Sequence, residues 1–223
     1  MEVSMYEILT NSPFFNGLTA KEIKELLQTV NYKIVEYPAK EIYTLAGMPC
    51  KYADFILKGE LISRMTGLSG KQVQINRLKA CDLIAPAFIF AKNNAMPVSV
   101  ETAQHTTIMR MMPSELKHLI NTNECIRMNF IQLISSIDVF LTQKLCMLSL
   151  FTVREKVAYF LMKAAKGQKS RTIKLSNSRQ EIADTFGIQK FSLLRCLSEF
   201  EDNGAIKIDG KQITILNSDK LMK

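Results

Sequence analysis

Side chains suited to reading nucleic-acid bases are concentrated between Ser178 and Glu199. An arginine fork can grip O6 and N7 of guanine together, whereas a phenylalanine offers only apolar contact, for instance to a thymine methyl group. Lysines mainly hold phosphates, which position a protein without reading sequence. The candidate contacting residues are Arg179, Gln189, Lys190, Phe191, Ser192, Arg195 and, further along the chain, Lys211.

The surrounding pattern predicts two short helices that would position these side chains. Ser178 and Glu181 fit a capping box at the start of the first helix. Gly187 marks a sharp turn. Helical spacing predicts that the pair buries Ile182, Ala183, Phe186, Ile188, Leu193, Leu194 and Leu197. This layout is typical of a helix-turn-helix, whose second helix enters the DNA major groove. Similar helix pairs are also common as simple packing units, and Phe191 could equally pack inward.

A small sheet should follow the helix pair. Residues 204–215 alternate apolar and polar side chains on both sides of Asp209-Gly210, a dipeptide that favours a type I′ hairpin. The segment 172–175 could add a third strand. Two helices followed by such a hairpin form a winged helix, which strengthens the nucleic-acid interpretation.

The N-terminal part reads as a different domain. Thr19 and Glu22 form another capping box, so a helix should begin there. From Tyr32 the apolar period changes to two, which is typical of short strands in a sandwich or small barrel. The predicted strands are 32–37, 41–45, 53–57, 61–65, 73–78 and 98–102, and the β-rich region ends near Met109.

A long helix is expected from about Asn123 to about Met147, after a short one that opens at Pro113. One apolar stripe has coiled-coil spacing and is assigned to a dimer interface; its residues are Ile126, Phe130, Leu133, Ile137 and Phe140. A second stripe, Ile134, Leu141, Leu145 and Leu148, lies beside it. Two stripes indicate two partners, the helix's own β domain and another chain; the alternative is burial within one subunit.

Composition supports a folded, nucleic-acid-binding chain. Of its 223 residues 47% are hydrophobic, and the net charge is +8. Lys and Arg number 14 against 8 Asp and Glu from residue 146 onward, but 15 against 13 before it. A basic C-terminal part would meet phosphates by releasing counterions, although a solvated basic surface is the simpler explanation. We find no apolar run long enough to cross a bilayer and no signal segment, so a cytoplasmic protein without membrane contact is expected.

The five cysteines are scattered and odd in number, which argues against a disulfide framework or a metal site. His105 and His118 are the only histidines. No cofactor is therefore expected, although haem is kept as a lesser alternative. No hydrolase, P-loop or cysteine–histidine motif occurs, so the chain is not expected to be an enzyme.

The order of β domain, long helix and winged helix resembles the CRP/FNR family of bacterial transcription regulators. The resemblance is carried by residues 12–18, by residues 52–60, and above all by residues 178–206, where Arg195 takes the family's guanine-reading position. It implies an α+β fold with a cyclic-nucleotide-binding-like β-roll (jelly roll) at 1–120, a dimerisation helix at 121–148 and a winged helix-turn-helix at 149–223. It further implies a homodimer on a palindromic operator in double-stranded DNA, an effector in the roll, and RNA polymerase as a partner.

The chain departs from the family pattern where the effector would bind. Members that bind cyclic AMP carry Gly-Glu and then Arg-Ser or Arg-Thr, and here Ala85-Pro86 and Met96-Pro97 stand in those places. Without an arginine there is no planar fork for a phosphate. We therefore expect an unidentified effector other than cyclic AMP, and a small apolar or weakly polar molecule fits the predicted pocket best; the alternative is that the chain has no effector. Its residues are Ala85, Pro86, Phe88, Phe90, Met96, Pro97 and Val98. The alternative function is a ligand-binding module whose C-terminal domain contacts protein rather than DNA.

Overall fold

The computed structural model describes residues 4–67 and 72–221. The chain forms two compact units. The first comprises Met1–Lys71 and Ile75–Phe140, and the second comprises Gln72–Gln74 and Leu141–Lys223. The division at Phe140 falls inside one long helix, so this helix contributes to both units.

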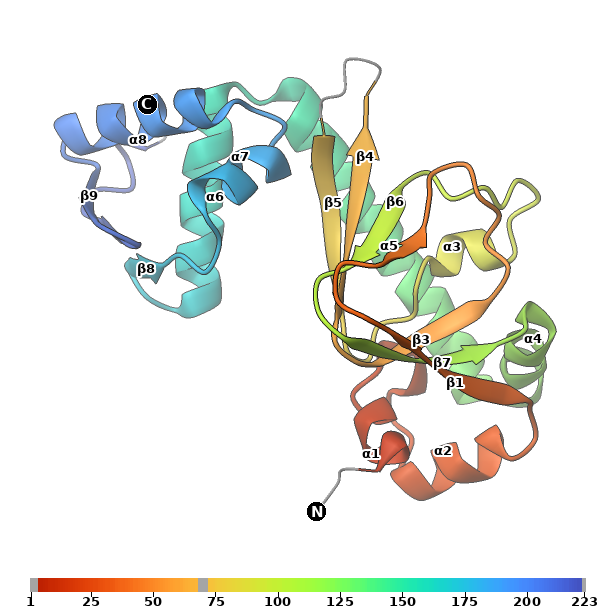
Figure 1. Cartoon of the computed structure of the whole chain (residues 1–223). Coiled ribbons are helices and arrows are strands. Elements are labelled where there is room, and N and C mark those ends of the chain that lie inside the picture. The colour runs from red at the N-terminus through yellow and green to blue at the C-terminus, as the bar shows by residue number, and fades with distance from the viewer. Residues whose placement is uncertain (1–3, 68–71, 222–223) are drawn as a thin grey trace. The chain divides into compact units, whose positions relative to one another are not determined.

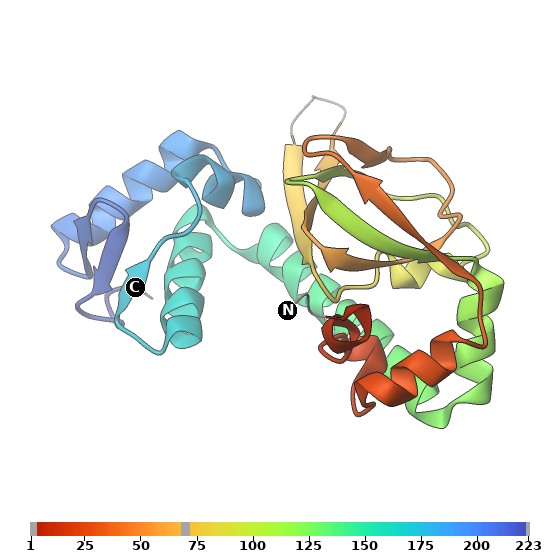
Figure 2. The same cartoon turned by 60° about the horizontal axis from the view of Figure 1, so that its bottom comes forward.

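The first unit begins with short helices that cover one end of its sheets (Figure 1, Figure 2). They are α1 Met5–Leu9, the 3-10 turn η1 Pro13–Phe15 and α2 Ala20–Leu27. The predicted capping box of α2 is confirmed. Thr19 N donates to Glu22 Oε2 over 2.8 Å, and Glu22 N donates to Thr19 Oγ1 over 3.3 Å. These two bonds satisfy backbone donors that a helix start otherwise leaves unpaired.

Among the described residues, seven strands form the β domain that the sequence predicts. They are β1 Tyr32–Tyr37, β2 Ile42–Thr44, β3 Ala53–Lys58, β4 Glu60–Thr66, β5 Gln72–Lys79, β6 Ser99–Thr102 and β7 Thr106–Met111. One sheet has the order β1-β7-β3 and the other β2-β6-β4-β5. A one-turn helix, α3 Pro86–Ile89, lies between β5 and β6 and was not expected from the sequence.

Strand β3 is buried on both faces, which explains why its sequence is nearly continuously apolar. Ile56 packs with Leu61, Val100 and Ile108 inside the roll. Phe55 points the other way and packs with the helices in a second core. The side chains of β3 therefore separate a roll interior from a helix-covered outer face.

The long helix α5 Glu124–Leu150 follows α4 Pro113–Thr122. Its N-terminal half is tied to the β domain, because Ile126 is fully buried and Phe130 and Leu133 pack against the helix-covered core. Asn129 Nδ2 donates to the carbonyls of Phe14 and Asn16 over 3.1 and 2.7 Å. Ile126 is therefore wrong as a member of the dimer stripe, since it has no surface left for another chain, whereas Phe130 and Leu133 are half-buried and stay a prediction. Ile137 and Phe140 remain half-buried.

The exposed apolar residues of α5 lie on other faces. They are Met128, Ile131, Val139, Leu141, Leu145 and Leu150. By length and composition alone α5 could cross a membrane, contrary to the expectation from sequence, and its apolar window is only 6% buried. Among the described residues, this apolar window is therefore largely left uncovered.

The second unit has a compact core of its own, built from α6 Val153–Gln168, the helix pair and a small sheet. The strands β8 Thr172–Lys174, β10 Gln212–Ile215 and β9 Ile206–Asp209 form one sheet in that order, which confirms the third strand. The hairpin differs from the type I′ prediction. Gln212 pairs with Asp209, so Gly210 and Lys211 are the central loop residues. Only Gly210 of these two has a positive φ, +54°, as in a type II′ turn.

Candidate nucleic-acid interface and ligand pocket

The predicted helix-turn-helix is present as α7 Arg179–Thr185 and α8 Lys190–Asp202. Its capping box forms as expected: Ser178 N donates to Glu181 Oε2 over 2.8 Å, and Glu181 N donates to Ser178 Oγ over 3.2 Å. Gly187 makes the turn with φ +61°, a conformation that a side chain would strain. Phe186 is buried and meets Phe160 of α6 edge-on, with ring centroids 5.8 Å apart.

One face of α8 is packed into the core and the other faces solvent. Leu193, Cys196, Leu197 and Phe200 are buried at a spacing of three and four. Leu194 is 42% exposed, so the prediction that it is buried is wrong. Cys196 is buried instead, because the buried stripe of α8 contains Leu193 and the residues three and four positions after it.

The solvent face of α8 holds the predicted base-reading side chains. Phe191 is 72% exposed, which rules out the alternative that it packs inward. Gln189 and Lys190 are exposed and Ser192 is half-buried. Arg195 Nε lies 3.5 Å from Glu199 Oε1, with both side chains largely in solvent. Such a pair contributes little energy, so Arg195 can leave it for a better partner.

The remaining two predicted contacts lie at or near the hairpin. Arg179 Nη2 donates to the carbonyl of Gly210 over 3.3 Å, and burial lowers the pKa of Arg179 from its ordinary value. Its guanidinium thus joins the start of α7 to the tip of the hairpin. Lys211 is exposed in the turn itself. These positions place basic side chains on the same domain as the exposed face of α8.

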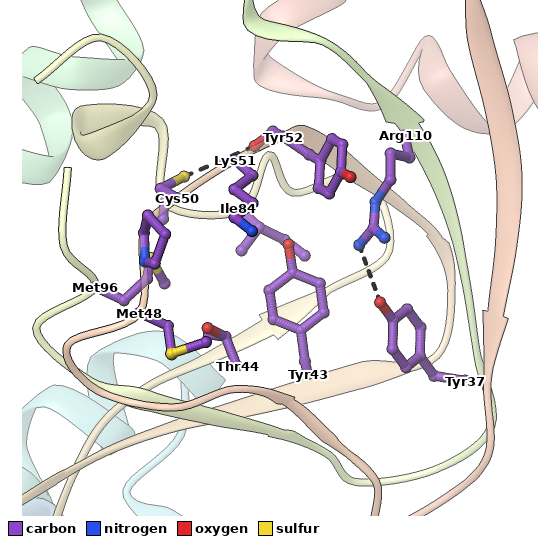
Figure 3. Close-up of a pocket in the computed structure, with 12 residues that line it drawn as sticks. Tyr37, Tyr43, Thr44, Met48, Cys50, Lys51, Tyr52, Ile84, Met96 and Arg110 are labelled. Carbon is purple, nitrogen blue, oxygen red and sulfur yellow. Dashed lines mark hydrogen bonds between the residues drawn. The ribbon is translucent and has the colours of Figure 1, made fainter.

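A separate cavity of about 180 Å³ opens into the roll of the first unit (Figure 3). Its wall is rich in tyrosine and sulfur. The lining residues are Tyr37, Tyr43, Thr44, Met48, Pro49, Cys50, Lys51, Tyr52, Ile84, Ala85, Met96 and Arg110.

A buried ion pair lies beside this cavity, and its arginine, Arg110, is part of the wall. Asp54 and Arg110 are direct partners in the antiparallel register of β3 and β7. Arg110 Nε lies 3.0 Å from both carboxylate oxygens of Asp54, and the Asp54 side chain is fully buried. Tyr43 donates its hydroxyl proton to Asp54 Oδ2 over 2.8 Å. Burial would lower the pKa of Arg110, but hydrogen bonds and the charge of Asp54 outweigh it and raise that pKa.

Aromatic rings complete this network. The guanidinium of Arg110 lies 4.5 Å from the ring centroid of Tyr52, and its Nη2 donates to the Tyr37 hydroxyl over 3.0 Å (Figure 3). Burial, followed by the negative charge of Asp54, raises the pKa of Tyr43, so its hydroxyl stays protonated as a donor. The arrangement holds charged groups in place without leaving either charge unpaired.

The geometry of the second unit is matched by a family model. Residues 155–223 match the Crp-like helix-turn-helix domain. The transcriptional activator protein Anr of Pseudomonas aeruginosa is 28% identical over 130 residues, which are 56% of this chain and 53% of Anr. The cAMP-activated global transcriptional regulator CRP of Haemophilus influenzae is 23% identical over 184 residues, 81% of this chain and 82% of CRP.

Solved structures match the whole architecture. The c-di-GMP responsive regulator CLP of Xanthomonas campestris superposes with a TM-score of 0.69 at 16% identity, covering 88% of this chain and 98% of CLP. A CooA variant from Carboxydothermus hydrogenoformans gives 0.74 at 15% identity, covering 100% and 95%. Residues 155–223 therefore form a Crp-like helix-turn-helix domain, and the chain as a whole is similar to CRP/FNR regulators. Its sheet domain, long helix and C-terminal helix-turn-helix have the same order as in these regulators.

Only some of the predicted effector residues lie at the cavity. Ala85 and Met96 line it. Pro86 is buried in α3, Pro97 is exposed, and Val98 packs against the roll core. Phe90 faces α5 instead, its ring meeting that of Phe130 at 5.8 Å and 80°. Pro86, Phe88, Phe90, Pro97 and Val98 do not line this cavity, so their assignment to an effector site stays a prediction.

The residues that sequence reasoning missed come from four distant segments, at 37, 43–52, 84 and 110. One signal was available: Asp54 and Arg110 are lone charges within otherwise apolar strands. Charged residues in such places are usually paired. The two histidines lie away from the cavity wall; His105 is on the surface, 3.7 Å from Glu36, and His118 is exposed on α4.

Proposed function

We propose that this chain is a transcription regulator of the CRP/FNR type, a homodimer that binds a two-fold symmetric operator through α8 and is controlled by an effector in the roll. The solvent face of α8 is the observation that supports the DNA-binding part of this proposal. It presents Gln189, Lys190, Phe191 and Arg195 above a packed helix-turn-helix. That is the placement a recognition helix needs to reach base edges in a major groove.

The exposed stripe of α5 supports dimer formation. Ile131, Ile134, Leu141, Leu145 and Leu148 recur at the three- and four-residue steps of a heptad, interrupted by one polar residue, Asp138. Three of them, Ile131, Leu141 and Leu145, are among the exposed large hydrophobic residues of the chain. A second copy of α5 would cover this stripe and would hold two recognition helices about one DNA turn apart, roughly 34 Å.

A protein partner covers this helix better than lipid would. Asp138 and Lys144 lie within α5, and charges in the hydrocarbon core are costly. The hydrogen bonds of Asn129 to the carbonyls of Phe14 and Asn16 also fasten the start of α5 to a folded domain.

The residues at the positions that bind cyclic AMP in the family support an effector other than cyclic AMP. Of the positions compared with the family's phosphate and ribose contacts, Ala85 and Met96 reach the cavity, and neither can bind a phosphate. Pro86 has no N–H to donate and is buried. An effector other than cyclic AMP is the proposal that fits this wall. RNA polymerase as a further partner rests on the family resemblance alone.

The test is a selection of bound duplexes from a random pool with the full chain. A dimer that reads DNA through α8 should enrich an inverted repeat with half-sites about one helical turn apart. Enrichment of a single half-site would contradict the dimer. No enrichment, together with no binding to duplex DNA at low salt, would contradict the DNA-binding function and favour the alternative in which the C-terminal domain contacts protein.

A further inference from the structure

We propose that the roll cavity is the effector site and that it accepts a compact aromatic carboxylate, one ring bearing a single negative charge. The role of the ligand as an effector rests on the proposed function, whereas the ligand class follows from the cavity alone. Size, wall chemistry and charge each restrict what can bind, and the segment beside the cavity gives binding a path to the long helix.

Size restricts the ligand to about one ring. The cavity holds about 180 Å³. An apolar cavity of roughly 150 Å³ accommodates benzene, so this one has room for a ring and one small substituent. A nucleotide, with its base, sugar and phosphate, needs far more space.

The wall favours an aromatic ring. Tyr43 and Tyr52 offer ring faces, and aromatic pairs gain from offset or edge-on contact beyond burial alone. Met48 and Met96 bring thioether sulfurs to the same space, and these make favourable contacts with ring edges. Figure 3 shows these side chains around a common hollow.

The charge balance of the cavity selects an anion. The carboxylate of Asp54 already accepts bonds from Arg110 and Tyr43, so a cationic ligand would find no acceptor there. Arg110 is in turn neutralised by Asp54. Lys51 lines the cavity, and no carboxylate of the described residues forms an ion pair with it.

One hydroxyl adds a directed hydrogen bond to that charge. Tyr37 accepts a bond from Arg110, which leaves its own proton available to donate among the described contacts. Lys51 would supply a carboxylate with a charged donor, and the Tyr37 hydroxyl is a neutral donor on the same wall. Charge-assisted hydrogen bonds of this kind are about twice as strong as neutral ones.

The segment from Ala85 to Met96 links the cavity to α5. Both of its ends line the cavity, and Ala85 holds the left-handed φ of +47°, which is uncommon for a residue with a side chain. Between them Phe90 places its ring edge-on against Phe130 of α5. A ligand that presses on Ala85 and Met96 can therefore move Phe90 against the helix that we assign to the dimer.

Calorimetric titration of the full chain with benzoate, benzamide and benzamidine tests the ligand class, because these probes share a ring and differ in charge. Benzoate should bind saturably, benzamide about tenfold more weakly or worse, and benzamidine not at all. Lys51→Met should weaken benzoate about tenfold, while Lys117→Met, which removes an exposed lysine of α4, should not. Equal binding of the three probes, absence of saturable benzoate binding, or an unchanged Lys51→Met variant would overturn the proposal.

Coupling is tested by measuring DNA affinity of the same proteins with and without benzoate. Benzoate should change the affinity of the unaltered protein, and Phe90→Ala should bind benzoate but lose that change. Benzoate binding with no effect on DNA affinity in the unaltered protein would overturn the effector role. Failure to bind DNA under any condition would instead overturn the proposed function, and the titration would still report on the cavity.

Discussion

Arg195 is the side chain of α8 that can discriminate most between bases. Its weak surface pair with Glu199 leaves the fork able to reach guanine O6 and N7, a contact worth about 1–3 kcal/mol of discrimination. We expect Arg195→Ala to relax the preference at one base pair of each half-site. A selection from random duplexes with the variant measures this. An unchanged guanine at that position would show that another residue reads it.

Asp54 should matter to stability more than any surface carboxylate. Its side chain is fully buried against Arg110, and removing one partner leaves the other as an unpaired buried charge. We expect Asp54→Asn to lower the free energy of unfolding by about 3–5 kcal/mol in a denaturant titration. Glu101→Gln is the matched control, because it breaks the exposed pair with Arg64 in the same domain and should cost at most about 1 kcal/mol. Equal losses in the two variants would contradict a buried pair.

Helix α5 is the element whose assignment changed most between sequence and structure. Its two apolar stripes have the same heptad spacing, so periodicity alone could not tell which one meets the β domain. The choice is made by residues far away in the chain, because the carbonyls of Phe14 and Asn16 capture Asn129 and turn Ile126 inward. The sequence alone predicts the length of the helix and the presence of two apolar faces.

Other elements show the same limit. Capping boxes and alternating strands depend on near neighbours, and they were predictable at Thr19, Ser178 and along β1. The hairpin turn was located, but its type depends on the register of Asp209 with Gln212. The cavity was largely missed, because its wall is assembled from strands whose pairing no local pattern specifies. Only the lone charges Asp54 and Arg110 hinted at it.

A charge placed on the exposed stripe of α5 should separate the dimer. We expect Leu141→Asp to shift the chain towards monomer in sedimentation, because each interface would then bury two unpaired carboxylates. Ser114→Asp adds the same charge at an exposed site on α4 and should leave the oligomeric state unchanged. Ile137→Asp, on the half-buried remainder of the first stripe, should have a smaller effect. A dimer that persists in Leu141→Asp would exclude this stripe as the interface.

At the scale of the whole molecule, the uneven charge determines how DNA affinity responds to salt. Most of the net +8 comes from the part of the chain that carries α7, α8 and the hairpin. Phosphate contacts release counterions, so the logarithm of the association constant should fall linearly with the logarithm of salt concentration. Lys190 is exposed at the start of α8 and is expected to hold a phosphate.

We therefore expect Lys190→Ala to weaken binding to all sequences alike and to flatten the salt slope by about one unit for each protomer's contact. Lys117→Ala removes the same charge from α4 of the first unit, and the slope should stay unchanged because that helix is not assigned to DNA. Fluorescence anisotropy across a salt series with selected and scrambled duplexes separates these effects. A Lys190→Ala variant could instead keep the salt slope and lose its preference for the selected duplex. That outcome would show that Lys190 contacts a base rather than a phosphate.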